Sequence, residues 1–396
     1  MKKRISLLGC ISLCVLAAVL TFQLTFHFVA GRYQEKLDTV SSGGSDFSRL
    51  SELSALIRKN YLGTVDDSAL EDGALRGYVE GLNDPYSRYL NPEEYEVYKQ
   101  SLSGAASGVG IRASQEPETG RVVVYDVLAS SPAEEAGIRK GDVLYRVDDV
   151  LVSELGFYKS MRALSGESGT KVKVSFLREV AAQEMELAFT LTRKEIKINS
   201  ISREMLADTV GYIQIFSFDL GTDEEFKTAV DSLTEEGATS LVIDLRNNGG
   251  GSLDAATRML DLILPAGVMY YRTGGNGTEV AVESDAQRID LPIVALMNEN
   301  TASAAELFAA VLKDKGAAKL VGTKSFGKGN GQRVLELEDG SALIVTSEQF
   351  RPAGGESFNG KGVIPDAEVK LEGESVYFVT RAKDDQLQEA IRLVKE

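Results

Sequence analysis

The chain has 396 residues, with 43 lysines and arginines against 59 aspartates and glutamates and a formal net charge of −16. Its 43% hydrophobic content is enough for two or three domains with their own cores and excludes large-scale disorder. The excess negative charge would repel nucleic acid and no basic stripe offsets it, so we expect no nucleic-acid partner.

The first residues predict a membrane anchor. MKKR precedes an almost uncharged run over residues 5–30, which is long enough to cross a bilayer as a helix. Positive charge before the run predicts that the rest of the chain is exported. Phe28 stands where a cleavage site needs a small residue, which favours an uncleaved anchor over a removed signal peptide; lipidation at Cys10 is the less favoured alternative. We therefore predict a single-pass anchor over residues 1–31 and an extracytoplasmic body.

The side chains that are missing from this body narrow its chemistry. Both cysteines, Cys10 and Cys14, and the only histidine, His27, lie in the predicted anchor. The body has neither thiol nor imidazole, which excludes Ser-His-Asp and Cys-His triads, histidine zinc sites and c-type haem attachment. We expect no metal and no organic cofactor.

Distinct patterns of secondary structure follow the anchor. Residues 32–46 end in SSGGS, which predicts a linker, and apolar residues at helical spacing predict a helical region over residues 47–103. Period-two alternation, as in RVVVYDV and KVKVSFLR, predicts a β-rich domain over residues 104–194. Strands alternating with helices over residues 195–373 predict a largely parallel sheet covered by helices, and residues 374–396 end in an amphipathic helix. The predicted fold class is multidomain α+β with an α/β core.

One candidate for chemistry is Ser303. Active sites on parallel sheets favour the carboxyl ends of strands, and NENTASAAELF begins at such an end. Glu306 follows Ser303 by three residues, a pattern typical of a helix cap. The same position would suit a nucleophile, because the Ala304 amide at the helix start can donate to an oxyanion. The segment itself is compatible with both roles.

A serine without histidine needs a lysine or a carboxylate as its base. Lys328 lies in TKSFGKGNGQ between Gly327 and Gly329, which allow close approach of the backbone, and Phe326 would help to exclude water and lower the pKa of the lysine. Gln332 would orient it by hydrogen bonding. The alternatives are a solvent lysine and a phosphate-binding loop, but no Ser or Thr follows the lysine, and a hairpin with an Asp-Gly turn is predicted where the helix of a phosphate-binding loop should begin.

A third loop, DLRNNGGGS at residues 244–252, leaves a buried strand and enters a helix through three glycines. Its exposed amides would form a nest for an anion. The alternative is a flexible strand-to-helix turn in which Ser252 serves only as the N-cap.

Together these motifs resemble the C-terminal processing peptidases, Ser-Lys endopeptidases that carry a PDZ domain ahead of the catalytic core. The resemblance includes NDPYSRYL, SGVGI, SPAEEAGIRKGDVLYRVDD, DLRNNGGG, NTASAAE, SFGKGNGQ and GKGVIPD, in this order. It implies Ser303 as nucleophile, Lys328 as general base and Gln332 as the residue that positions the lysine. It also implies oxyanion donation by the amides of Gly250 and Ala304. One departure is Gly249, where the family usually has proline.

The same resemblance assigns residues 104–194 to a PDZ domain. Gly108, Val109, Gly110 and Ile111 would present backbone amides to a C-terminal carboxylate while the peptide adds as a β-strand; the alternative is a β-turn in an ordinary small barrel. We therefore expect protein substrates with apolar C-termini and a domain that gates the catalytic pocket. A homodimer is expected by resemblance alone. A catalytically inactive PDZ scaffold is the competing function.

Overall fold

The computed structural model describes Thr21, Gln23 and residues 47–102, 105–116, 119–180, 183–197, 199–206, 209–285, 289–371, 376–377 and 379–396. The predicted anchor and linker therefore lie outside the described residues, except for Thr21 and Gln23. None of the helices in the described part has the length and hydropathy that a bilayer crossing requires. The chain divides into two compact units, residues 1–71 and 72–396.

Helix α2 (Ser48–Asn60) lies in the first unit, and α3 (Asp67–Glu80) begins there and continues into the second. Both lie where apolar spacing predicted helices. Neither contains a buried residue, and Leu50, Leu53 and Leu56 are 47%, 53% and 51% exposed. These leucines of α2 are therefore about half exposed.

The β-rich domain begins and ends on a pair of antiparallel strands, β2 (Ala105–Gly108) and β9 (Lys194–Lys197). Between them is an antiparallel sheet in which β6 pairs with β5 and the other strands follow the order β3-β4-β5-β7-β8. Alternation along β4 and β7 places Val124 and Phe176 in a separate core. The remaining elements are β3 (Ile111–Gln115), β4 (Val122–Val127), β5 (Val143–Val147), β6 (Val150–Leu151), β7 (Lys171–Val180), β8 (Gln183–Thr192), α5 (Pro132–Glu135), α6 (Val152–Leu155) and α7 (Phe157–Leu164).

The α/β core contains the predicted parallel sheet. Its strand order is β10-β11-β12-β15-β16-β19, with only the β10–β11 pair antiparallel. The strands are β10 (Ile201–Leu206), β11 (Val210–Ile215), β12 (Ser240–Asp244), β15 (Ile293–Met297), β16 (Ala318–Gly322) and β19 (Ala367–Glu368). All residues of β12 and β15 are buried, as their continuous apolar runs predicted.

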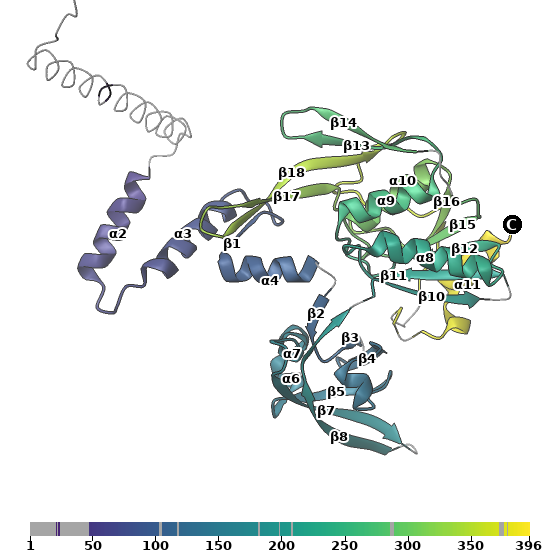
Figure 1. Cartoon of the computed structure of the whole chain (residues 1–396), viewed down its shortest axis with the longest axis horizontal. Helices are drawn as coiled ribbons and strands as arrows, with labels where there is room; N and C mark the ends of the chain where they lie inside the picture. Colours follow the sequence, from purple (N-terminus) through teal and green to yellow (C-terminus); the bar gives the residue numbers. More distant parts are fainter. Residues whose placement is uncertain are drawn as a thin grey trace, which may run out of the picture. The chain divides into compact units, whose positions relative to one another are not determined.

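Helices cover both faces of this sheet (Figure 1). One face packs in a single apolar cluster with α8 (Thr222–Glu235), α9 (Leu253–Ile263) and α10 (Ala304–Asp314). The other face packs on α11 (Asp385–Val394), the predicted C-terminal helix, through Leu387, Ala390 and Val394. The carboxyl ends of β12, β15 and β16 lead into the three loops that the sequence analysis selected.

A second, antiparallel sheet was not predicted as such. It contains β1 (Arg88–Leu90), β13 (Gly267–Gly274), β14 (Glu279–Ser284), β17 (Asn330–Glu336) and β18 (Ala342–Pro352). Strands β17 and β18 form the predicted hairpin around its Asp-Gly turn. Strand β1, next to α4 (Pro92–Leu102), falls in the region predicted as helical, but it pairs with β18. This pairing brings a segment that precedes the β-rich domain onto the α/β core.

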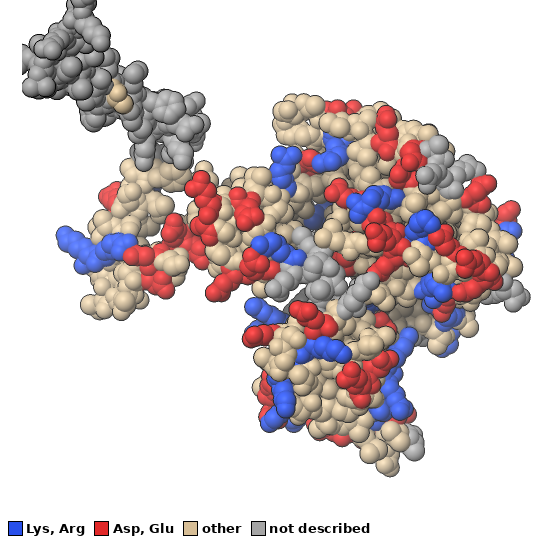
Figure 2. Space-filling model, viewed as in Figure 1, with Lys and Arg blue, Asp and Glu red and all other residues tan. Residues whose placement is uncertain are grey.

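Figure 2 shows Lys and Arg interspersed with Asp and Glu on the face in view, without a continuous basic surface. Basic side chains of the chain also pair with carboxylates. Arg258 of α9, for example, donates to Asp223 in the first turn of α8, where a carboxylate also suits the positive end of the helix dipole.

Candidate active site

Ser303 is the N-cap of α10 and follows the loop that leaves β15. Its backbone has φ 57° and ψ −120°, a conformation that costs a residue with a side chain about 1–3 kcal/mol. Glu306 stabilises this turn, because its Oε2 accepts a hydrogen bond from the Ser303 amide at 3.0 Å. The serine is thus a helix cap, as its pattern predicted, but in a strained turn typical of a functional residue.

The glycine loop after β12 lies directly against this turn. A Cβ on Gly250 would lie 2.8 Å from the Ala302 carbonyl oxygen and 2.9 Å from the Ala304 nitrogen, and its φ is +98°, so only glycine fits there. The amide of Gly250 donates to Asn248 Oδ1 at 2.8 Å. The two predicted oxyanion donors are therefore neighbours, but the Gly250 amide already has an acceptor. A Cβ on Gly249, where the family usually has proline, would meet nothing within 4 Å.

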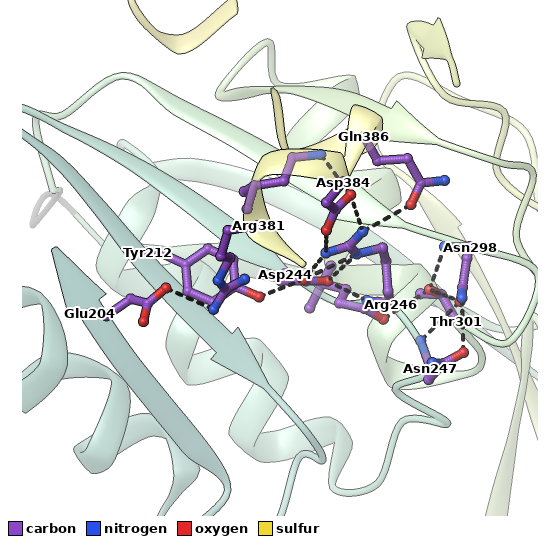
Figure 3. Close-up of polar contacts among 12 residues, drawn as sticks. Glu204, Tyr212, Asp244, Arg246, Asn247, Asn298, Thr301, Arg381, Asp384 and Gln386 are labelled. Atoms are coloured by element: carbon purple, nitrogen blue, oxygen red, sulfur yellow. Dashed lines mark hydrogen bonds and ion pairs between the residues drawn. The ribbon is translucent and has the colours of Figure 1, made fainter. Parts of the chain in front are cut away.

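Asparagine side chains join the glycine loop to the serine loop (Figure 3). Asn247 and Asn298 exchange two hydrogen bonds, at 2.9 Å and 2.8 Å. The Asn248 carbonyl accepts from the Ala302 amide at 2.9 Å, and the Leu245 carbonyl accepts from Thr301 Oγ1 at 2.9 Å. These contacts fix the relative position of the two loops. These contacts were not predicted from the sequence, although asparagines at adjacent strand ends were a usable signal.

Arg246 ties the glycine loop to the C-terminal segment (Figure 3). Its guanidinium, in a residue only 3% exposed, donates to the carboxylates of Asp244 and Asp384 and to Gln386 Oε1. Burial disfavours the charge, but the two carboxylates outweigh it and raise the pKa of Arg246. Asp244 also accepts from Tyr212 Oη at 2.7 Å. The C-terminal helix is thus part of the framework that holds this loop.

Glu306 connects the serine turn to the lysine loop. It is fully buried, and its carboxylate accepts hydrogen bonds from the amides of Gly327 and Lys328 at 2.6 Å and 2.7 Å, and from Ser325 Oγ. Together with the Ser303 amide, this makes four donors from two loops. From the sequence, Glu306 could be predicted as a capping residue, but its connection to the lysine loop could not.

The side chain of Lys328 is half-buried, and its Nζ lies 4.5 Å from the centroid of the Tyr86 ring. Burial lowers the pKa of Lys328, and Arg88 adds to this effect, whereas the carboxylates of Asp84 and Glu306 oppose it. The predicted lowering of the pKa is therefore confirmed in direction. Phe326 is 60% exposed, so the expectation that it helps to exclude water was wrong.

The structure does not join all the predicted catalytic groups. Although Ser303 and Lys328 are both described, no hydrogen bond links their side chains. Gln332 Nε2 donates weakly to Thr346 Oγ1 at 3.3 Å and to the Asn330 carbonyl at 3.4 Å, and it makes no bond to Lys328. The roles implied for Lys328 and Gln332 therefore require a rearrangement.

A cleft of about 380 Å³ opens beside the serine. Its walls include Ser303, Ala304 and Gln332, together with Arg272 and Glu348. The last two form a bidentate ion pair, at 2.7 Å and 2.9 Å. Ser303 therefore forms part of the wall of this cleft. Within the described residues, no group of three or more His, Cys, Asp or Glu side chains could hold a metal ion.

The predicted carboxylate loop lies at the start of the β-rich domain. Gly110 has φ +83°, and a Cβ there would lie 2.1 Å from Ser131 Cβ. Ile111 begins β3, the strand at the end of its sheet, where a peptide strand can add. The Val109 side chain is 2% exposed and belongs to the domain core, so only its backbone is available to a peptide. Gly108 pairs with Lys194 at the boundary of the domain.

Comparisons with known proteins agree with this arrangement. The model of peptidase family S41 matches residues 209–369, a PDZ-domain model matches residues 107–189, and the model of the activating protease CtpB N-terminal domain matches residues 21–94. The carboxy-terminal processing protease CtpA of Bacillus subtilis (strain 168) is 31% identical over 359 residues, which cover 90% of this chain and 76% of that protein.

Two further relatives extend the similarity. The carboxyl-terminal-processing protease of Synechocystis sp. (strain ATCC 27184 / PCC 6803 / Kazusa) is 33% identical over 326 residues, covering 81% of this chain and 76% of that protein. Among solved structures, the photosystem II D1 C-terminal processing protease matches with a TM-score of 0.53 and 28% identity, over 84% of this chain and 89% of that chain.

Proposed function

Because this chain belongs to the C-terminal processing peptidase family, with an S41 peptidase domain and a PDZ domain, we propose that it cleaves proteins by a Ser303–Lys328 dyad. The observation that carries this proposal is the position of Glu306. One buried carboxylate bonds the backbone amides of both residues, so the loops that carry the nucleophile and the base are anchored to a single point.

In the proposed reaction, Lys328 accepts the proton of Ser303 Oγ as this oxygen attacks the substrate carbonyl carbon. The amides of Gly250 and Ala304 then donate to the oxyanion. Lys328 returns its proton to the leaving amine, and water hydrolyses the acyl-enzyme. Two changes from the present structure are needed: Lys328 must approach Ser303, and the Gly250 amide must exchange Asn248 for the oxyanion.

The β-rich domain would select substrates by their C-termini. This proposal is supported by the edge strand β3 and the tight turn at Gly110 before it. The backbone amides of residues 108–111 would donate hydrogen bonds to the C-terminal carboxylate of the peptide. We further propose a single-pass anchor over residues 1–31 with the body outside the cytoplasm, supported by MKKR and the apolar run after it. Self-association as a homodimer is supported by the exposed leucines of α2, Leu50, Leu53 and Leu56.

Covalent labelling tests the catalytic proposal. A fluorophosphonate probe should attach to Ser303, as mapped by mass spectrometry, and peptide turnover should fall as labelling proceeds. Ser303→Ala should abolish both the label and turnover, whereas Ser232→Ala in α8, which does not line the cleft, should change neither. An inactive scaffold would instead bind peptides without labelling or turnover, and that result would refute the proposed peptidase activity.

A matched pair of substrates tests recognition by the C-terminus. Two peptides of one sequence, long enough to reach both sites, should differ in kcat/KM by about 10- to 100-fold when one ends in a free carboxylate and the other in an amide. The reason is that hydrogen bonds to a charged group contribute about 1.5–3 kcal/mol. A short peptide that reaches only the serine serves as control and should show no such difference. Equal rates for both long peptides would contradict the role of the PDZ domain.

A further inference from the structure

The NDPYSRYL segment has no role in the reaction described so far, yet it covers the proposed base. Tyr86 of this segment presents its ring to Lys328 Nζ. Among the described residues, the ammonium group of Lys328 has no hydrogen-bond or ion-pair partner. The aromatic face of Tyr86 is therefore a direct contact of this ammonium group, at 4.5 Å from the ring centroid.

Strand pairing and a short turn hold Tyr86 in place. Strand β1 follows it directly and pairs with β18. Within the turn, Asp84 accepts hydrogen bonds from the Tyr86 amide at 3.2 Å and from Ser87 Oγ. Ser87 Oγ in turn accepts from the Thr346 amide of β18 at 3.0 Å. Thr346 Oγ1 also accepts the hydrogen bond from Gln332 Nε2. Strand β18 therefore contacts both the turn that carries Tyr86 and the side chain of Gln332.

The charges around Lys328 are mixed. Arg88 disfavours the ammonium form, whereas Asp84 and Glu306 favour it, and burial lowers the pKa. An aromatic face attracts a cation but not a neutral amine, so the ring favours the charged form. A lysine that acts as a base must lose this charge. The contact therefore stabilises the form of Lys328 that cannot accept a proton, in a position without a hydrogen bond to Ser303.

We propose that Tyr86 is a positioning residue for the base: its ring holds the ammonium form of Lys328 away from Ser303 until a bound substrate draws the lysine into the dyad. This inference rests on the proposed Ser303–Lys328 mechanism. It gives the NDPYS turn a defined task, because the turn sets both the place and the proton affinity of the lysine.

The test uses the full chain and variants of position 86 that separate the aromatic face from the apolar bulk of the side chain. Tyr86→Phe retains the aromatic face, and pentafluorophenylalanine at the same position removes its attraction for cations. Tyr86→Leu is an apolar variant without a ring. Tyr271→Leu is the matched control, because it removes a similar contact, with Arg351 at 4.2 Å, elsewhere in the fold. Competitive acetylation against pH, read by mass spectrometry, reports the pKa of Lys328 whether or not this lysine is catalytic.

The pentafluoro and leucine variants should lower the pKa of Lys328 by about 0.5 to 1.5 pH units, from the usual strength of a cation–π contact. The rise of kcat/KM with pH should move to lower pH by the same amount, while Tyr86→Phe and Tyr271→Leu should match the unmodified protein. If the pKa of Lys328 is unchanged or raised in both the pentafluoro and the leucine variant, the role of Tyr86 is refuted, but the proposed Ser303–Lys328 dyad is not. A lowered pKa with an unmoved kcat/KM profile would overturn the role of Tyr86 together with the role of Lys328 as base.

Discussion

Replacing Lys328 by methionine is expected to lower kcat/KM for peptide hydrolysis by about 10³-fold or more. The chain after residue 31 offers no imidazole or thiol to take over, so the serine would lose its general base, and loss of one member of a catalytic unit typically costs about 10⁴- to 10⁶-fold in kcat. Methionine has a similar length but no proton-accepting nitrogen. The measurement is steady-state turnover of a peptide with a free C-terminus.

Stability serves as the control for this variant. Methionine removes a half-buried ammonium that makes no hydrogen bond with the described residues, so unfolding by urea should occur at an unchanged or higher concentration. Lys324→Met, on the exposed part of the same loop, should retain full activity. If Lys328→Met hydrolysed peptides at the rate of Lys324→Met, the dyad would be wrong.

The second large effect is expected for Glu306→Ala. This change leaves four donors without their shared acceptor: the amides of Ser303, Gly327 and Lys328, and Ser325 Oγ. Each buried donor left without an acceptor costs about 1–3 kcal/mol, so the free energy of unfolding should fall by several kcal/mol. Activity should be lost as well, because the serine turn and the lysine loop would no longer be held together.

Urea titration measures this loss, with two comparison variants. Glu306→Gln keeps the size of the side chain and one acceptor oxygen, so it should be intermediate in stability and remain measurable if the alanine variant does not fold. Glu299→Ala removes an exposed glutamate from the same loop, where it accepts one bond from Thr323 Oγ1 at 2.8 Å, and should cost less than about 1 kcal/mol. Equal unfolding midpoints for Glu306→Ala and Glu299→Ala would contradict the anchoring role.

Several features of the protein could be predicted from sequence because their causes are local. The parallel sheet follows from strands that alternate with helices, and the β17–β18 hairpin follows from alternation around an Asp-Gly turn. The position of the candidate loops follows from one general rule, since the carboxyl ends of parallel strands meet at one edge. Motif order identified the family, which the comparisons confirm.

Other features depend on contacts between distant parts of the chain. Strand β1 looked like part of a helical region, because three residues carry too little periodicity to reveal a partner in β18. Glu306 looked like a capping residue, and its bonds to the lysine loop cross 21 and 22 residues of sequence. The bond between Arg246 and Asp384 spans 138 residues, so no local pattern predicts it.

Composition and motifs thus define the available chemistry: a body without histidine or cysteine, three polar loops at strand ends, and the family to which they belong. The arrangement of these groups becomes visible in the folded chain alone. There Lys328 contacts Tyr86 and makes no hydrogen bond to Ser303, the Gly250 amide donates to Asn248, and one buried carboxylate joins two loops. Composition and periodicity report local conformation and burial, whereas hydrogen bonds and aromatic contacts depend on which distant segments the folded sheets bring together.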